Sequence, residues 1–441
     1  MRRLKVKLLF ILLMITVMLP LTADAQRRHA QKTHVQSSFV TAHDGKLWWG
    51  GRPYYYVGTN LWYGAILGSE GQGGNRARLC KELDLLKQHG INNLRILVGS
   101  DGKRNVTGKV EPTLQEAPGV YNDTILAGLD YLLQQMGKRK MVAVLYLNNS
   151  WEWSGGYNYY LEQAGAGKAM MPQEVGYPTF MNHVSQFATN EKAHQLFYDY
   201  VRFILNRTNR YTGKKYIEDP AIMSWQIGNE PRAFSTDALP AFAKWLREAS
   251  ALIRSIDGHH LISIGSEGSW GCENSYEWWQ RICEDPNIDY CNLHMWPYNW
   301  SWAKKDSLME NLPRACKNAR EYINHHVQIC KKIGKPLVME EFGYPRDGFQ
   351  FALSTSTKAR DGFYSFIFNL VYQNALQGEP FAGCNFWGWG GYAQPRHEQW
   401  QVGDDYSGDP AQEQQGLNSV FAGDKTTLQL ISSYSRKLSK L

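Results

Sequence analysis

The sequence predicts a (β/α)8 TIM barrel formed by one domain. Eight apolar, strand-like runs alternate with patterns of helical period along most of the 441 residues. Two of these runs, WQIGNEPR at Trp225–Arg232 and LVMEEFGYP at Leu337–Pro345, carry a Glu near their ends, followed by Pro231 or Gly343, which break regular structure. Polar residues at the carboxyl ends of apolar strands are typical of barrels, because barrel chemistry takes place at that end.

The first 25 residues have the pattern of a cleavable export signal. Four basic residues precede the apolar run Leu8–Leu21, and Ala23–Ala25 is a small-x-small cleavage site. The run of about 14 residues is short for a membrane span, which needs roughly 20. We therefore expect a signal peptide over 1–25, a secreted or periplasmic protein, and no membrane span in the mature chain. Residues 26–38 are polar and predict a flexible segment, followed by a single catalytic domain over 39–441.

The expected elements follow one another in a regular order. Phe39–Tyr56 contains two short apolar runs joined at Asp44–Gly45, which predicts a β-hairpin. The eight strands are expected at Tyr55–Thr59, Asn93–Val98, Met141–Leu147, Ile222–Gly228, Leu261–Gly265, Tyr290–His294, Leu337–Glu341 and Gly383–Trp387. Helices are expected at Arg76–His89, Thr124–Lys138, Glu191–Thr208, Ala238–Ile256, Leu312–Ile333, Ala359–Leu376 and Lys425–Leu438.

Two connections of the predicted barrel are unusually long. One is Asn148–Asn190 after the third strand, and the other is Gly388–Gly423 after the eighth. Both leave from the carboxyl ends of strands, where loops of this length are usually functional. We therefore expect these two loops to build a substrate cleft.

Charge and cysteine content exclude several classes of function. Without the signal, 44 Lys and Arg face 40 Asp and Glu, and no basic stripe is visible, so we expect no nucleic-acid partner. No CxxC or CxxxH spacing indicates a metal, and we expect neither metal nor cofactor. Seven cysteines leave at least one unpaired within a single chain. Cys272 and Cys283 are candidates for a disulfide, whereas Cys291 and Cys384 lie in predicted strands and are expected to pack as small apolar side chains.

Aromatic residues are abundant and cluster beside Gly and Asn. The chain has 16 Trp, 25 Tyr and 17 Phe, many of them in stretches such as NNSWEWSGGYNYY at Asn148–Tyr160. These side chains could fill a large core or a partner surface. Sugars, however, bind by stacking on aromatic rings while their hydroxyls meet polar side chains, and a Trp, Tyr, Asn and Gly mixture on loops favours that interpretation.

The two strand-end carboxylates are the candidate catalytic pair. Retaining cleavage of a glycosidic bond needs an acid that protonates the leaving oxygen and a carboxylate about 5 to 5.5 Å away that attacks the anomeric carbon. Glu230 and Glu341 supply such a pair. Arg95, at the end of the second strand, is the expected cation beside the nucleophile, with an ordinary salt bridge as the alternative. Strand alternation does not decide between Glu340 and Glu341, because it requires only that one of them face the mouth.

Three further residues are assigned to the same rim. His294 ends the sixth strand and precedes a run rich in Trp and Tyr. Asn229 comes directly before the candidate acid and is placed to hydrogen-bond a sugar hydroxyl. Trp387 ends the eighth strand and is the expected floor beneath the reacting sugar, while Trp389 can instead belong to the core.

These motifs resemble glycoside hydrolase family 5, and within it the bacterial, fungal and plant β-mannanases. The strongest block is Phe187–Arg232, which combines a Tyr-rich helix, an N-x-x-T-G turn, a Tyr-x-x-Asp-Pro step and the NEPR strand. GTNLWYG near Gly58, LRI at Arg95, the W-x-x-x-G-G of Trp151–Gly156 and GDPAQEQQGLNSVFAGDKTT before the last helix are also similar. The likeness covers most of the mature chain and supports the barrel fold.

The resemblance implies roles for individual residues. Glu230 corresponds to the acid/base, and Glu341 to the nucleophile. The implied substrate-binding residues are Asn60, Trp62, Arg95, Trp151, Asn229, Arg232, His294, Trp296 and Trp387. Two positions depart from the pattern: Trp296 stands where the family usually has Tyr, and Gln226 stands where Glu is common, at a position expected to point away from the mouth.

The sequence therefore predicts a secreted, metal-independent, retaining hydrolase. Its expected substrate is a β-mannan polysaccharide or manno-oligosaccharide, cut at internal β-1,4 bonds by double displacement, and we expect a monomer. Three alternatives stay open: an exo-acting β-mannosidase if the long loops wall off distal subsites, a β-1,4-glucanase on the same barrel, and a carbohydrate-binding barrel without catalysis. The last is disfavoured because both carboxylates and Arg95 are present.

Overall fold

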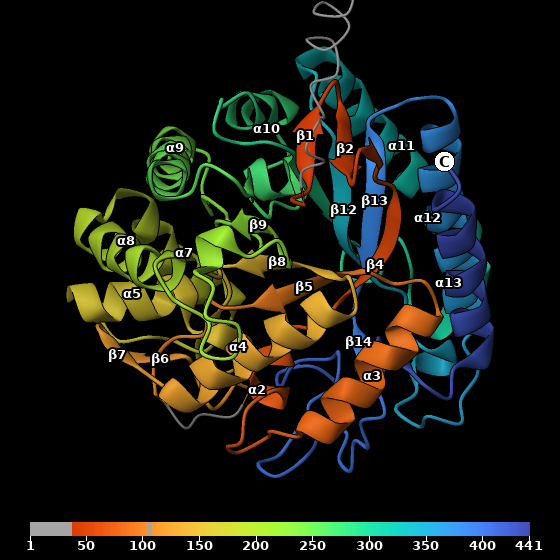
Figure 1. Ribbon diagram of the computed structural model, residues 1–441, viewed down its shortest axis with the longest axis horizontal. Helices are drawn as coiled ribbons and strands as arrows, with labels where there is room; N and C mark the ends of the chain where they lie inside the picture. The colour runs from red at the N-terminus through yellow and green to blue at the C-terminus, as the bar shows by residue number, and fades with distance from the viewer. Residues whose placement is uncertain (1–37, 104–107) are drawn as a thin grey trace, which may run out of the picture. The chain divides into compact units, whose positions relative to one another are not determined.

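The structure is a computed structural model that describes residues 38–103 and 108–441. The predicted signal peptide and residues 26–37 lie outside this part of the chain. Eight parallel strands form one sheet in the order β10-β9-β8-β5-β4-β13-β12-β11, as the sequence predicts for a (β/α)8 barrel (Figure 1). The strands are β4 Tyr56–Asn60, β5 Asn93–Leu97, β8 Val142–Tyr146, β9 Ile222–Gln226, β10 Leu261–Ser263, β11 Cys291–Met295, β12 Leu337–Phe342 and β13 Phe381–Phe386.

The two ends of this sheet are joined by hydrogen bonds, so the strands enclose a barrel. Asp289 donates its N–H to the carbonyl of Ile262 at 2.9 Å. The side-chain oxygen of Asn292 on β11 accepts from the backbone N–H groups of Ile264 and Gly265, just after β10, at 3.1 and 2.8 Å. Every strand residue of the barrel is buried, which explains why these strands appear in the sequence as mainly apolar runs.

Helices pack around the outside of the barrel (Figure 1). They are α3 Arg76–Gln88, α4 Asp123–Lys138, α8 Glu191–Leu205, α9 Leu239–Ile256, α10 Tyr276–Cys283, α11 Leu308–Ile333, α12 Lys358–Leu376 and α13 Lys425–Leu438. Asparagine side chains cap several of them: Asn75, Asn122 and Asn190 accept backbone N–H groups at the starts of α3, α4 and α8. The core lies between the helices and the sheet. Among the described residues, none of the helices combines the length and apolar character that a membrane span needs.

The predicted N-terminal hairpin is present and has a third strand. β1 Thr41–His43, β2 Lys46–Trp49 and β3 Arg52–Pro53 form a small antiparallel sheet. Its first turn uses Asp44 and Gly45, both with positive φ (53° and 68°). Phe39, just before β1, stacks on His259, two residues before β10 begins. The hairpin therefore lies at the end of the barrel where the strands begin, opposite the catalytic end.

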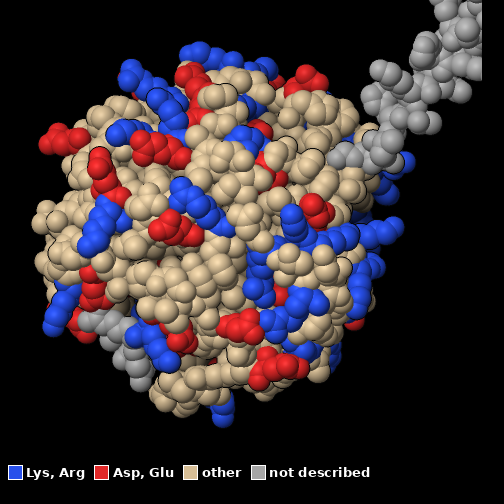
Figure 2. Space-filling view, turned by 60° about the vertical axis from the view of Figure 1, so that its left-hand side comes forward, with Lys and Arg blue, Asp and Glu red and all other residues tan. Residues whose placement is uncertain are grey.

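The two long connections carry structure of their own. The first contains η1 Glu152–Ser154, α5 Gly156–Ala164, α6 Pro172–Val175, α7 Tyr177–Val184 and η2 Ser185–Thr189. The second contains the short strands β14 Trp389–Gly391 and β15 Val420–Phe421, which pair with each other. Smaller elements elsewhere are α2 Gly64–Leu67, β6 Gln115–Ala117, β7 Val120–Tyr121, η3 Tyr216–Glu218, η4 Gly268–Cys272, η5 Lys305–Ser307 and η6 Asp347–Phe349. Over the face shown in Figure 2, basic and acidic side chains lie interspersed.

The candidate disulfide between Cys272 and Cys283 is not formed. All seven cysteines fall within the described residues, and all are free thiols. Cys283, the last residue of α10, instead has its thiol in contact with Cys291 on β11. Cys291 and Cys384 are fully buried in the sheet, consistent with the apolar packing expected of them.

Candidate active site

A cavity of about 480 Å³ opens at the carboxyl end of the barrel. Both long connections reach it, as the sequence analysis expects: Trp151 and Tyr177 come from the first, and Gln412 and Glu413 from the second. Eight aromatic side chains line it: Trp151, Trp153, Tyr177, Trp270, Trp296, Tyr298, Trp300 and Trp387. Polar and aromatic groups thus converge on one hollow at the end of the barrel where such folds carry out their chemistry.

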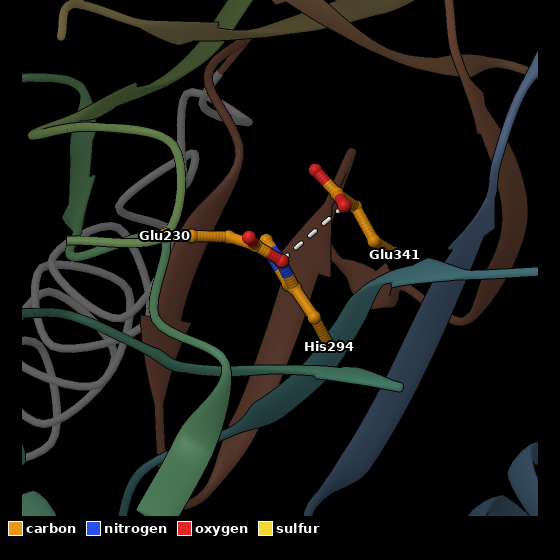
Figure 3. A group of neighbouring side chains, drawn as sticks. All are labelled: Glu230, His294 and Glu341. Carbon is orange, nitrogen blue, oxygen red and sulfur yellow. Dashed lines mark hydrogen bonds and ion pairs between the residues drawn. The ribbon is translucent and has the colours of Figure 1, made fainter. Parts of the chain in front are cut away.

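Glu230 and Glu341 face each other across this cavity, beside His294 (Figure 3). Carboxylate oxygens of the two Glu and a ring nitrogen of His294 all lie within 4.8 Å of one another. His294 Nδ1 is 2.9 Å from Glu230 Oε1 and 3.5 Å from Glu341 Oε2. An inverting glycosidase needs more widely spaced carboxyls, because a water molecule must fit between one carboxylate and the sugar. The short separation found here leaves no room for that water and is the geometry of a retaining glycosidase.

The backbone at Glu230 is held in an uncommon conformation. Its φ of 48° lies in the left-handed region that residues with a side chain seldom adopt. The strand β9 has ended at Gln226, and the Glu230 N–H donates to the carbonyl of Gly265 at 2.9 Å, while Ser150 donates to the Glu230 carbonyl. Neighbouring strands therefore fix the turn that aims this carboxyl into the cavity, and such local strain is typical of functional sites.

Arg95 on β5 is the cation beside Glu341. Its Nη1 donates to Glu341 Oε1 at 2.5 Å, and its Nη2 donates to Asn229 Oδ1 at 2.9 Å. The guanidinium is fully buried and stacks on the ring of Tyr146, with 4.3 Å between its central carbon and the ring centroid. A buried cation in direct contact with a carboxylate favours the ionised form, which a nucleophile needs.

A bulge in β12 explains why the adjacent residues Glu340 and Glu341 have different surroundings. Leu293 on β11 pairs with Met339, but the next residue, His294, pairs with Glu341, so Glu340 is an extra residue on β12. Glu341 lines the cavity, whereas Glu340 is fully buried below Arg95. Both side chains reach the same guanidinium, because the bulge interrupts the normal alternation of the strand.

The electrostatic surroundings of the two cavity carboxyls differ. Burial raises the pKa of both carboxyls, and the nearby charge of Glu230 adds to the rise at Glu341. At Glu341 the Arg95 guanidinium opposes that rise by direct contact. Burial lowers the pKa of His294 to about 3, so the imidazole next to Glu230 is neutral. The direct contact with Arg95 therefore favours the ionised form of Glu341, which is the form that a nucleophile needs.

Side chains around Glu230 come from its own turn and from two further segments. The Trp151 indole N–H donates to Glu230 Oε2 at 2.6 Å. The Arg232 guanidinium lies over the Trp151 ring at 5.5 Å, and its Nε donates to Glu267 Oε2 at 2.5 Å. Arg232, Trp151 and Glu267 all line the cavity. This row places a charged, hydrogen-bonding wall next to the group that would protonate a leaving sugar.

Asn229, Trp296 and Trp387 also line the cavity. Asn229 Oδ1 accepts from Arg95, and its Nδ2 donates to Asn149 Oδ1 at 3.2 Å. The Trp296 indole N–H points toward Glu341 Oε2 at 3.4 Å. The Trp387 and Trp296 rings meet edge to face, with 6.2 Å between centroids.

Asn60 and Trp62 do not line the cavity, although the resemblance implied substrate contact. Asn60 is fully buried on β4, where its Oδ1 accepts from Arg95 Nη1 at 3.1 Å. Trp62 is 1% exposed, and its indole N–H donates to the Gly408 carbonyl at 3.0 Å. Asn60 therefore contacts Arg95, and Trp62 contacts the second long connection, both from behind the cavity.

Some cavity residues were not singled out from the sequence. Glu267 follows β10 and could have been found by the rule that identified Glu230, namely a polar residue after a strand end. Glu152 and Glu413 lie within the long connections, where no periodic pattern marks them. One carboxylate oxygen of Glu413 is buried without a hydrogen-bond partner among the described residues, and burial raises the pKa of this carboxyl well above its usual range.

The trio Glu230, His294 and Glu341 also has donor atoms close enough to hold a metal ion. A cation there would sit beside the guanidinium of Arg95, 2.5 Å from Glu341, and would be repelled in this buried setting. The site is therefore better suited to reaction by two carboxyls, and we assign no metal ligand.

The chain is similar to known enzymes over nearly its whole length. A family model described as glycoside hydrolase family 5 beta-mannosidase-like matches residues 37–441. A mannan endo-1,4-beta-mannosidase of Arabidopsis thaliana is 26% identical over 433 residues, covering 92% of each chain. A family 5 mannosidase structure from Rhizomucor miehei shares 32% identity with a TM-score of 0.83, covering 91% of this chain and 98% of that one. An endo-1,4-beta-mannanase from the same organism shares the fold, at 22% identity and TM-score 0.65, covering 91% and 100%. The chain therefore belongs to the β-mannosidase-like group of glycoside hydrolase family 5.

Proposed function

We propose that the protein hydrolyses β-1,4-mannosidic bonds within mannan, glucomannan or galactomannan and retains the anomeric configuration. The observation that carries this proposal is the facing pair Glu230 and Glu341, whose carboxylate oxygens lie within 4.8 Å of each other, with Arg95 hydrogen-bonded to Glu341. The curated plant relatives, among them those of Arabidopsis and Solanum lycopersicum, are named mannan endo-1,4-beta-mannosidases, which supports mannan as the substrate and internal cleavage as the mode.

The geometry gives each carboxyl one role in a double displacement. Glu230 donates its proton to the glycosidic oxygen while Glu341 attacks the anomeric carbon, so the leaving sugar departs and a covalent glycosyl-enzyme forms. Glu230, now ionised, takes a proton from water as that water attacks the same carbon, which releases Glu341 and the retained product. Asn229 hydrogen-bonds the reacting sugar, and Trp387 supports its face.

An exo-acting β-mannosidase is the second candidate. The Rhizomucor miehei mannosidase structure is more similar to this chain than the endo-mannanase of that organism, at TM-scores of 0.83 and 0.65. In addition, Glu152 and Glu413 enter the cavity from the two long connections, and a wall there would admit only a chain end. Both modes use the same chemistry at Glu230 and Glu341.

Product analysis on mannohexaose labelled at its reducing end separates internal cleavage from exo cleavage. Internal cleavage yields labelled mannobiose, mannotriose and mannotetraose among the first products, whereas exo cleavage yields labelled mannopentaose and free mannose. Cellohexaose, run in parallel, tests the glucanase alternative. Glu341→Gln is the matched inactive control, and binding of mannohexaose without cleavage by the unaltered protein would favour a carbohydrate-binding barrel instead.

Proton NMR of the first products should show the β-anomer, and initial release of the α-anomer would contradict the retaining mechanism.

We also propose that the protein is exported and monomeric. The basic and apolar residues before Ala25 support cleavage of a signal peptide at that point. Mass spectrometry of the protein recovered outside the cytoplasm should give a chain that begins at Gln26, and light scattering after size-exclusion chromatography should give the mass of one chain. An uncleaved N-terminus or a dimer mass would contradict the respective proposal.

A further inference from the structure

A buried hydrogen-bonded chain lies directly beneath the nucleophile. Arg95 Nε donates to Gln226 Oε1 at 2.8 Å, and Gln226 Nε2 donates to Glu340 Oε2. Tyr290 donates its hydroxyl to Glu340 Oε1 at 3.0 Å. All four side chains are fully buried inside the barrel. None of them lines the cavity, so they act on a bound sugar only through another residue.

Arg95 lies between two carboxylates that compete for it. Its Nη1 is 2.5 Å from Glu341 Oε1, and its Nε is 3.9 Å from Glu340 Oε2. In a buried site of low dielectric, a guanidinium is drawn strongly to either acid. A direct pair with Glu340 would pull the charge away from the nucleophile, yet the structure has the direct pair with Glu341.

The amide of Gln226 occupies the space where that competing pair would form. Arg95 is a donor only, so it must face the amide oxygen, and the amide N–H₂ is then directed at its other neighbours. These are Glu340 and the hydroxyl of Ser263, the latter at 3.0 Å. The amide oxygen and the amide N–H₂ group thus both have partners, which fix the orientation of the amide. It supplies Arg95 Nε with a neutral acceptor and Glu340 with a donor.

We propose that Gln226 is a neutral spacer which keeps Arg95 on the nucleophile Glu341 and away from the neighbouring carboxyl Glu340. This inference rests on the proposed double-displacement function. Gln226 is in this sense a positioning residue, because it touches neither the sugar nor the reacting atoms. Burial raises the pKa of Glu340 to about 7, with Arg95 opposing, which is consistent with a carboxyl that lacks its direct cation partner.

Few charged groups surround Glu340 and Glu341, so the direction in which the loss of Gln226 shifts the pKa of Glu341 can be stated. Without it Arg95 moves toward Glu340, and Glu341 loses the cation that favours its ionised form. The groups facing Glu340 are Tyr56, Arg95, Tyr290 and Glu341, and those facing Glu341 are Arg95, Tyr146, Glu230, His294, Glu340 and Glu413. Arg95 is the permanent cation in this set, and its position therefore dominates.

A double-mutant cycle on Gln226 and Glu340 tests the proposal. Gln226→Leu should lower kcat on mannohexaose by at least about tenfold while KM changes by less than about threefold, because sugar contacts are untouched. Its acid limb of kcat/KM should move to higher pH, since Glu341 is more easily protonated. Adding Glu340→Gln removes the competing charge, so the double variant should regain at least about fivefold in kcat over Gln226→Leu, and its acid limb should move back.

The rescue is what a merely structural role would not produce, because two damaged core positions would add their losses. A double variant as slow as Gln226→Leu, or slower, overturns the proposal, as does an unshifted acid limb in Gln226→Leu. Circular dichroism and thermal unfolding check each variant, and Gln226→Met replaces Gln226→Leu in the cycle if the latter does not fold. Turnover of mannohexaose by the unaltered protein tests the proposed function separately, so either idea can fail alone.

Discussion

The indole N–H of Trp151 donates to the Oε2 of Glu230 over 2.6 Å. The two residues come from different segments: Trp151 lies near the start of the connection after β8, and Glu230 lies in the turn after β9. The hydrogen bond favours the ionised form of Glu230 and so opposes the rise in pKa that burial causes. A loop residue thus adjusts how firmly the acid holds its proton.

Replacing this indole gives the first prediction, a shift in the pH profile. In Trp151→Phe the N–H is lost, so the pKa of Glu230 rises further and the acid keeps its proton to higher pH. The alkaline limb of kcat/KM on mannohexaose should therefore move to higher pH, measured over a full pH series. Trp270→Phe, another Trp of the same cavity, is the control and should leave that limb in place. A shift of the limb to lower pH in Trp151→Phe would contradict the assignment of Glu230 as the acid.

The two carboxyls should respond differently to truncation. Glu230→Ala should lower kcat on mannan by roughly 10²–10⁴-fold, the usual contribution of general acid–base catalysis. An aryl mannoside with a good leaving group needs little protonation, so its first step should survive in this variant, and added azide should then yield a β-mannosyl azide. Glu341→Ala should lose turnover of both substrates, and azide should not restore a β-product. Near wild-type turnover by Glu341→Ala would show that the nucleophile was assigned wrongly.

The eight strands were predictable from sequence because each is buried on both faces and appears as a mainly apolar run. The choice between Glu340 and Glu341 was not predictable in the same way. Alternation within β12 assumes regular pairing, but pairing with β11 inserts Glu340 as an extra residue. That bulge depends on a strand about 45 positions away in sequence, so no local pattern contains it. The resemblance to known relatives supplied the choice of Glu341 instead.

Loop-borne cavity residues were the other part that sequence reasoning could not place. Glu413 has no strand or helix period around it, and its approach to the cavity depends on how β14 and β15 pair. Trp62 shows the reverse case: it is part of a family motif, yet it lies behind the cavity, where its indole N–H donates to the Gly408 carbonyl of the same connection. In both cases the position is set by contacts between segments far apart in the chain.

The start of the last helix, α13, should be important for stability. Asp424 accepts two hydrogen bonds from Arg346, at 2.9 and 2.8 Å, and lies 3.6 Å from Arg360, and both guanidinium groups are fully buried. Asp424→Ala leaves these cations without their carboxylate, so the free energy of unfolding should fall by about 3–5 kcal/mol.

Chemical denaturation monitored by Trp fluorescence measures that loss. The control is Glu277→Ala, which removes an exposed pair with Arg281 one helical turn away and should cost less than about 0.5 kcal/mol. Equal losses in Asp424→Ala and Glu277→Ala would show that the buried arginines find other partners.

Trp296 should affect rate more than binding. Its indole N–H lies 3.4 Å from Glu341 Oε2, and its ring packs so tightly on Gly343 that a Cβ there would lie 2.5 Å from it. An indole donates through one N–H only, so Trp296→Phe removes the contact with the nucleophile and keeps a flat ring in the cavity.

If the Trp296 N–H helps orient Glu341, Trp296→Phe should lower kcat by more than it raises KM, because the contact acts on the nucleophile and not on ground-state sugar. If the ring instead serves as a stacking surface, Trp296→Phe should be mild, and Trp296→Ala should mainly raise KM. Steady-state kinetics of both variants on one manno-oligosaccharide separate the two roles, and a raised KM with unchanged kcat in Trp296→Phe would exclude the role in orienting Glu341.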